Sequence, residues 1–265
     1  MSGYTVNKDR KNLGAAWKWG AENYAQWPER QNPFHATRKY QEERSPRYVP
    51  PEKDFWKFTD YLQKRARSED PIAVQDYVMH QVFLHLAARK GEVFRLKKQD
   101  LDFDQDRIRL WTRKRRGGQL ESDWLPMPSE LRVGLLRWLE IRMKLPVRTD
   151  YVFVNVDGDA AHRDYFLDQF SARRAFMHRM CERIKIKPFG YHAIRHFTAS
   201  HLYAKGVSAS VIQAILRHTN SNTTARYLRT LGLDPAIKEA LEEGITRPAE
   251  VISLEQKRLG DSIRG

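Results

Sequence analysis

The chain has 265 residues, of which 41% are hydrophobic, enough for one full domain with an appendage. No apolar run reaches the ~20 residues that cross a bilayer, and no secretory signal opens the chain, so we expect a cytoplasmic protein without membrane partners. The formal net charge of +14 favours nucleic acid as the partner, although membrane-surface and ribosomal proteins share such a charge.

The amino-terminal part is predicted to hold one helix and a basic linker. Apolar residues at helical spacing indicate a helix over residues 5–25, with Asn7 as its cap. Residues 32–51 combine four prolines with basic residues and little apolar periodicity, which is typical of a linker. Arg38 and Lys39 in this linker are candidates for contact with a phosphate backbone, and a plain solvated linker is the alternative.

The rest of the chain is predicted to be mainly helical. Three short antiparallel strands are expected near residues 102–103, 108–111 and 123–126, and a further short strand near 151–154. We therefore expect a mainly α (α+β) fold in which a small antiparallel sheet interrupts the helices. Apolar residues at helical spacing predict helices near 52–67, 71–88, 129–144, 164–184, 192–205, 208–217, 221–230 and 235–243.

One predicted helix contains residues that suit phosphate binding. His192 and Arg195 are three apart, so they are neighbours on one side of the predicted helix and form a phosphate clamp. Exposed His and Arg at this spacing also arise freely on helix surfaces. Zinc is the third interpretation, since His192 and His196 are four apart, but Ala193 stands where a metalloprotease has its Glu.

Further candidates lie downstream. Ser208 is a suitable cap for a helix that ends just before His218. Tyr227 follows nine residues later, between Arg226 and Arg229. Tyrosine is a poor nucleophile near neutral pH because its pKa is ~10, although neighbouring cations ease the loss of its proton. Tyr227 taken alone is a packing residue.

Upstream of these residues, two basic segments stand out. Arg89 follows a strongly apolar helix, and its simplest role is an exposed ion pair with Glu92. The second segment is the tip of the predicted hairpin, where a Gly-Gly turn follows four basic residues and commonly contacts phosphates. These residues are Arg113, Lys114, Arg115 and Arg116.

The only cysteine, Cys181, excludes an intramolecular disulfide and is predicted to be a core residue.

Taken in order, these residues resemble the catalytic domain of tyrosine recombinases, the phage-integrase kind. The family's boxes are an Arg with a following Glu and Leu, a Lys in a β-hairpin, His-x-x-Arg-His, Leu-Gly-His, and a Tyr about nine residues beyond. Any one box is weak, but all five in order are specific, and they cover roughly residues 50–230. The matching residues are Arg89, Glu92, Leu96, Lys114, His192, Arg195, His196, Leu216, His218 and Tyr227.

The resemblance implies site-specific recombination of double-stranded DNA through a covalent 3′-phosphotyrosine. By resemblance, Tyr227 attacks the phosphate, Arg89 and Arg195 hold its oxygens, and Lys114 protonates the leaving group. His218 then binds the phosphate and His192 assists proton transfer at Tyr227. The family needs no metal and no nucleotide cofactor, and its members act as tetramers on synapsed DNA, in some cases with DNA-bending accessory proteins.

The chain departs from the family's pattern at three places. Ala87 and Arg217 replace glycines, which puts the local backbone geometry in doubt. Residues 1–31 resemble only the last helix of the family's DNA-clamping domain, so we expect a catalytic fragment with a catalytic domain at 52–230 and a terminal helix and tail at 231–265. Alternatives are topoisomerase IB-like nicking and closing, or a DNA-binding remnant that never cleaves.

Overall fold

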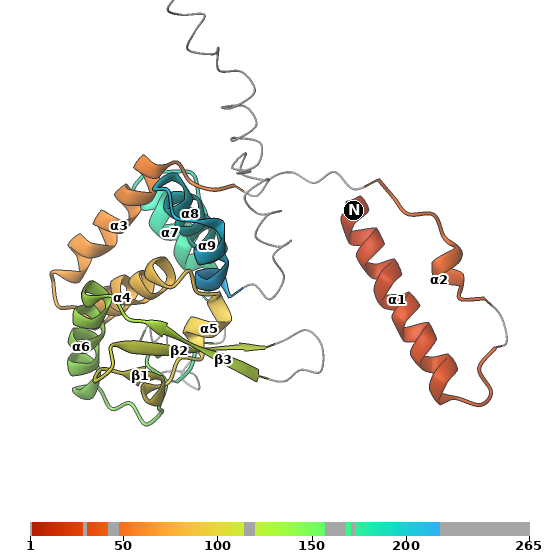
Figure 1. Cartoon of the computed structure of the whole chain (residues 1–265), viewed down its shortest axis with the longest axis horizontal. Helices are drawn as coiled ribbons and strands as arrows, with labels where there is room; N and C mark the ends of the chain where they lie inside the picture. The colour runs from red at the N-terminus through yellow and green to blue at the C-terminus, as the bar shows by residue number, and fades with distance from the viewer. Residues whose placement is uncertain are drawn as a thin grey trace, which may run out of the picture. The chain divides into compact units, whose positions relative to one another are not determined.

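The computed structural model describes residues 2–28, 31–41, 48–113, 120–156, 168–170 and 173–217. It divides into two compact units, Met1–Arg47 and Tyr48–Gly265, drawn in Figure 1. His218, Tyr227, Lys114, Arg115, Arg116 and the helices predicted at 221–230 and 235–243 lie outside the described residues.

The first unit is a long helix, α1 (Gly3–Asn23), against which the chain folds back through the short α2 (Pro33–Ala36). The prediction that Asn7 caps α1 is wrong. The Ser2 hydroxyl accepts the hydrogen bond from the Thr5 amide, and the Asn7 side chain instead donates to the Tyr40 carbonyl.

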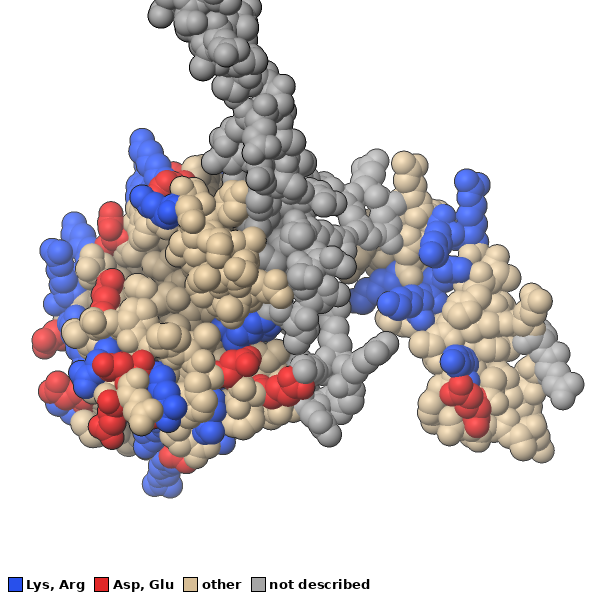
Figure 2. Space-filling view, viewed as in Figure 1, with Lys and Arg blue, Asp and Glu red and all other residues tan. Residues whose placement is uncertain are grey.

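Charged groups on this unit are mostly basic (Figure 2). Its described Lys and Arg residues are Lys8, Arg10, Lys11, Lys18, Arg38 and Lys39.

The second unit is built around α4 (Pro71–His85), which is buried on all sides because α3, α6 and α8 pack against it. Asp70 caps α4 by accepting from the amides of Ile72 and Ala73. The other helices are α3 (Glu52–Ala66), α5 (Lys90–Phe94), α6 (Ser129–Met143), α7 (Arg174–Arg183), α8 (Tyr191–Ala204), α9 (Ala209–Leu216) and the 3₁₀ helix η1 (Lys98–Asp100).

The predicted small sheet is present. Strands β1 (Leu101–Asp102), β2 (Arg107–Arg113) and β3 (Leu120–Pro126) pair antiparallel in the order β1-β2-β3. Ile108 and Leu110 of β2 are buried, while Arg107 and Arg109, which alternate with them, hold the Trp124 ring between their guanidinium groups at 4.5 and 5.1 Å. One face of the sheet therefore closes the core, and the other is an arginine and tryptophan surface.

Three predicted elements differ from the structure. The helix predicted at 71–88 ends at His85, because Ala87 adopts a left-handed conformation with φ 44° that cannot continue a helix. Residues 151–154 form only isolated bridges, one of which pairs Val154 with Gln169. The helix predicted at 164–184 begins at Arg174 in the structure, and of the predicted residues before it only 168–170 and 173 are described.

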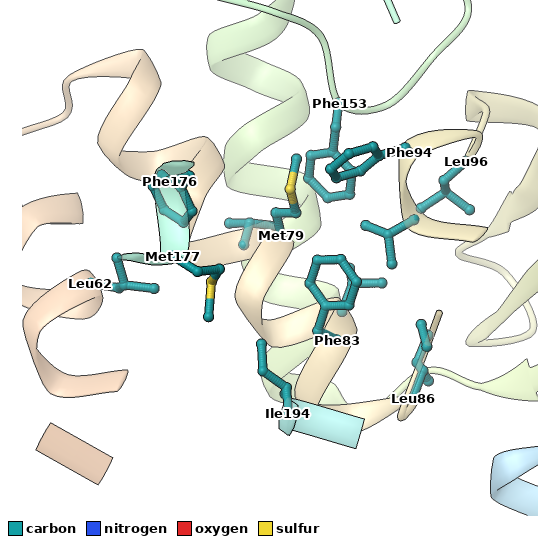
Figure 3. Packing of buried hydrophobic residues seen from close by; sticks show 14 of the residues in the cluster. Leu62, Met79, Phe83, Leu86, Phe94, Leu96, Phe153, Phe176, Met177 and Ile194 are labelled. Atoms are coloured by element: carbon teal, nitrogen blue, oxygen red, sulfur yellow. The ribbon is translucent and has the colours of Figure 1, made fainter. Parts of the chain in front are cut away.

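The core of the second unit is one continuous apolar cluster (Figure 3). Met79 and Phe83 of α4 lie at its centre, with Phe153, Met177 and Ile194 approaching from other segments. Cys181 is fully buried in this cluster, as predicted. No helix in the described part of the chain is both long and apolar enough to span a membrane.

His80 makes this core sensitive to acid. It is buried on α4, its Nε2 lies 2.9 Å from the Thr59 hydroxyl, and burial, aided by the charge of His85, lowers the pKa of His80 to about 3. The unfolded chain binds a proton near pH 6.5, which the folded core excludes until about pH 3. Stability from this group is intact above pH 6.5 and is lost as the pH falls toward 3.

We predict that the free energy of unfolding falls by about 2 kcal/mol more in the wild type than in His80→Gln between about pH 7 and about pH 5. Urea titrations of both proteins at each pH measure the difference, in which the acid titration of carboxylates common to both cancels. Parallel pH profiles would contradict the assignment of a neutral His80 in the core.

Candidate functional site

Arg89 stands at the amino-terminal cap of α5, and Glu92 in the first turn of that helix turns back toward it. The Glu92 carboxylate accepts the Arg89 amide and the Arg89 Nη1 group, both at 2.8 Å. The predicted ion pair is therefore present, but the expectation that it is exposed is wrong. The Glu92 side chain is only 1% exposed, whereas the Arg89 side chain is 36% exposed.

Glu92 also collects partners from two distant segments. The Thr112 hydroxyl on β2 donates to Oε1 at 2.5 Å, and Arg217 Nη2 at the end of α9 donates to Oε2 at 2.6 Å. Burial acts to raise the pKa of the Glu92 carboxyl, but the Arg217 charge and the bonds from Thr112 and Arg89 outweigh it and hold the pKa below its ordinary value. Glu92 is thus an ionised, buried hub that joins α5, β2 and the end of α9.

Arg195 of α8 is buried, with 1% of its surface exposed. Its Nη1 donates to the Ala87 carbonyl at 2.6 Å, and its Nη2 donates to the Leu216 carbonyl. Arg195 therefore ties the segment that leads to Arg89 to the last turn of α9, directly before His218 in the sequence.

Arg217 bridges the same two segments. Its Nη1 donates to the Leu86 carbonyl at 3.2 Å and to the Ile215 carbonyl at 3.0 Å. Two arginines thus cross-link the chain after α4 to the end of α9. We call the cluster of Arg89, Glu92, Thr112, Arg195 and Arg217 the arginine bridge.

The two positions at which the chain departs from the family's glycines both adopt left-handed backbone. Ala87 has φ 44° and Arg217 has φ 51°. Glycine takes this conformation freely, whereas other L-residues lose about 1–2 kcal/mol in it. The backbone shape expected of glycine is therefore present at both positions without glycine.

The remaining predicted residues are placed as follows. His192 is exposed on α8, and its ring contacts that of His196 at 4.7 Å between centroids. Arg113 ends β2 opposite Leu120, and Arg38 and Lys39 are exposed in the first unit. Within the described ranges, no three His, Cys, Asp or Glu side chains gather closely enough to hold a metal ion.

The sequence predicted Arg89 and Arg195 as site residues, whereas the contacts of Thr112 and Arg217 with Glu92 were not predicted. Thr112 carries no signal of its own, because many strand threonines face neighbouring polar groups. Arg217 does carry a signal in the sequence. A long cationic residue in place of the glycine of the Leu-Gly-His box requires a compensating contact.

Comparisons with known proteins place this site in a family. The phage integrase family model matches residues 53–231, and the chain belongs to that family. A tyrosine recombinase of Pseudothermotoga lettingae is 28% identical over 176 residues, covering 64% of this chain and 55% of the relative. Tyrosine recombinase XerC of Staphylococcus aureus is 26% identical over 172 residues, covering 63% and 52%. The chain thus spans about half the length of these curated relatives.

Solved structures share the fold. The XerA recombinase matches with a TM-score of 0.57 and 22% identity, over 78% of this chain and 68% of that one. An integrase fragment of the Tn1549 transposon, in complex with circular intermediate DNA, matches with a TM-score of 0.62 and 18% identity, over 86% and 75%. The predicted fold class, helical with a small antiparallel sheet, is confirmed.

The two hydrogen bonds of Arg195 allow us to predict how a substitution at this residue changes the free energy of unfolding. Arg195→Met removes the donor from two carbonyls at once, so we expect it to lower the free energy of unfolding by about 3 kcal/mol. Arg137→Met is the matched control, because Arg137 is a half-buried arginine that donates to the single carbonyl of Ala66, and we expect a loss of about 1 kcal/mol. Urea unfolding measures both, and equal losses would argue against the bridging role of Arg195.

Proposed function

We propose that this chain carries the catalytic domain of a site-specific DNA recombinase, which cleaves and rejoins strands through a covalent 3′-phosphotyrosine at Tyr227. The observation that carries the proposal is the joining of Arg89 and Arg195 through the segment 87–89, inside a family match that also spans Lys114, His192, His218 and Tyr227. DNA cleavage by this route requires cations that face one phosphate, and the bond of Arg195 to the Ala87 carbonyl, two residues before Arg89, supports such an arrangement.

In the proposed reaction the Tyr227 oxygen attacks the scissile phosphorus, and the bond from phosphorus to the 5′-oxygen breaks. The phenol proton leaves with the assistance of His192, and Lys114 supplies a proton to the departing 5′-hydroxyl. Arg89, Arg195 and His218 stabilise the charge that builds on the nonbridging oxygens. The phosphotyrosine bond keeps the energy of the original ester, so the 5′-hydroxyl of another strand can attack it and rejoin the DNA without a metal or nucleotide cofactor.

The proposed partner is double-stranded DNA, held by a tetramer of this protein on two synapsed sites, with DNA-bending accessory proteins. The net charge of +14 supports DNA as the partner, and solved relatives are described as bound to DNA, including the Tn1549 integrase and XerH on its difH substrate. We assign phosphate contacts to Arg38, Lys39, Arg113, Arg115 and Arg116. We further propose that the protein is DNA-associated in a prokaryotic cytoplasm.

We propose that the chain consists of four parts. Residues 1–31 correspond to the last helix of a DNA-clamping domain, and residues 32–51 link it to the catalytic domain at 52–230. Residues 231–265, for which the sequence predicts a terminal helix and tail, lie outside the described residues. The basic surface of the first unit supports a role against DNA.

The experiment is a search for the covalent intermediate. The protein is incubated in EDTA with a pool of nicked duplexes of randomised sequence, in which cleavage releases a short fragment and so traps the adduct. We expect a DNA adduct that survives detergent and is enriched for particular sequences. Tyr227→Phe should form none, because it lacks the attacking oxygen, whereas the matched control Tyr61→Phe on α3 should form it normally.

The outcome decides between functions. No adduct from any sequence in the pool, or an adduct that persists in Tyr227→Phe, would contradict the proposed reaction. Sequencing the recovered DNA then gives the preferred site, on which rejoining between two duplexes is measured directly. Relaxation of supercoiled DNA without such exchange would assign the chemistry to nicking and closing instead.

A further inference from the structure

Arg217 stands at the position of the glycine in the Leu-Gly-His box that the chain resembles, yet its side chain is buried and hydrogen-bonded. Its side chain is 4% exposed, and it donates to Glu92 Oε2 and to the carbonyls of Leu86 and Ile215. A glycine forms none of these bonds. The left-handed backbone that glycine adopts without strain is held here by the contacts of a long side chain.

Each of the two carboxylate oxygens of Glu92 accepts two hydrogen bonds. Oε1 accepts from Arg89 Nη1 and from the Thr112 hydroxyl, whereas Oε2 accepts from the Arg89 amide and from Arg217 Nη2. Arg89 therefore reaches the carboxylate with one terminal nitrogen of its guanidinium. Within the described part of the chain, Nη2 and Nε of Arg89 have no hydrogen-bond partner in the protein, and the side chain is 36% exposed.

Removing Arg217 would change this arrangement. Without Arg217, Oε2 keeps only its bond from the Arg89 amide, and its vacated acceptor position invites the paired geometry in which two guanidinium nitrogens face two carboxylate oxygens. Such a pair would turn a second edge of Arg89 toward Glu92 and away from an incoming phosphate. It would also leave one cation, in place of two, beside the buried carboxylate, while Asp123 adds a further negative charge close to position 217.

We propose that Arg217 is a positioning residue for strand cleavage, which occupies the second oxygen of Glu92 and thereby leaves one edge of the Arg89 guanidinium free for the scissile phosphate. It acts through Glu92 and does not touch the phosphate itself. The same side chain bonds the carbonyls of Leu86 and Ile215, which joins the last turn of α9 to the segment after α4. This inference rests on the proposed function.

The first test compares Arg217→Gly and Arg217→Lys with the wild type in the covalent adduct assay, on a recovered site. We expect Arg217→Gly to slow adduct formation at saturating DNA by about tenfold to a hundredfold, because Arg89 is misplaced. The DNA concentration for half-saturation should change by less than about threefold, because most phosphate contacts remain. Arg217→Lys should recover part of the rate, since it keeps a charge that reaches Glu92 but cannot bond both carbonyls.

The second test is a double-mutant cycle with Glu92→Gln. If Arg217 acts through Glu92, the effect of Arg217→Gly on the rate shrinks to about threefold or less in the Glu92→Gln background. Arg142→Gln controls for the loss of a buried arginine elsewhere, since Arg142 on α6 bonds the Thr149 carbonyl. Its rate per folded molecule, with the folded fraction taken from urea unfolding, should equal that of the wild type.

Each outcome separates the two claims. No adduct from the wild type overturns the proposed function, and the role of Arg217 with it. A wild-type adduct together with an unchanged rate in Arg217→Gly overturns the role of Arg217 alone. An equally large effect of Arg217→Gly with and without Glu92→Gln, or an equal loss in Arg142→Gln, overturns action through Glu92 and leaves Arg217 as a stability residue.

Discussion

The buried carboxylate of Glu92 is the constraint on which the candidate site depends. A charge removed from water requires partners of opposite sign and several hydrogen bonds, or the group would take up a proton instead. Glu92 meets this requirement with Arg89 from its own helix, Thr112 from β2 and Arg217 from the end of α9. Three separate segments are therefore held at one point, and the exposed side of Arg89 is oriented as a consequence.

Arginine side chains hold the left-handed backbone at this site. Left-handed backbone at Ala87 and Arg217 costs conformational energy, and the bonds of Arg195 and Arg217 to the carbonyls of residues 86, 87, 215 and 216 offset that cost. Both turns lie next to residues with proposed catalytic roles, Arg89 and His218. The proposed catalytic residues are therefore only one or two positions away in the sequence from the two residues with left-handed backbone.

Much of the fold could be predicted from the sequence, because α3, α6 and α8 each have apolar residues at regular helical spacing. Element ends were less predictable. The end of α4 depends on the conformation of Ala87, which nothing in the local sequence indicates. For the site, the order of boxes predicted Arg89 and Arg195, and their catalytic roles stay a prediction. The burial of Glu92 could not be foreseen, because two partners come from positions 20 and 125 residues away in the chain.

A crystal structure of the protein joined covalently to a cleaved half-site tests the central claim most directly. We predict that the phosphate contacts the edge of the Arg89 guanidinium that faces away from Glu92. Glu92 should still lie between Arg89 and Arg217, and Arg217 should remain bonded to the carbonyls of Leu86 and Ile215. A phosphate gripped by Arg217, with Glu92 released from both arginines, would contradict the account.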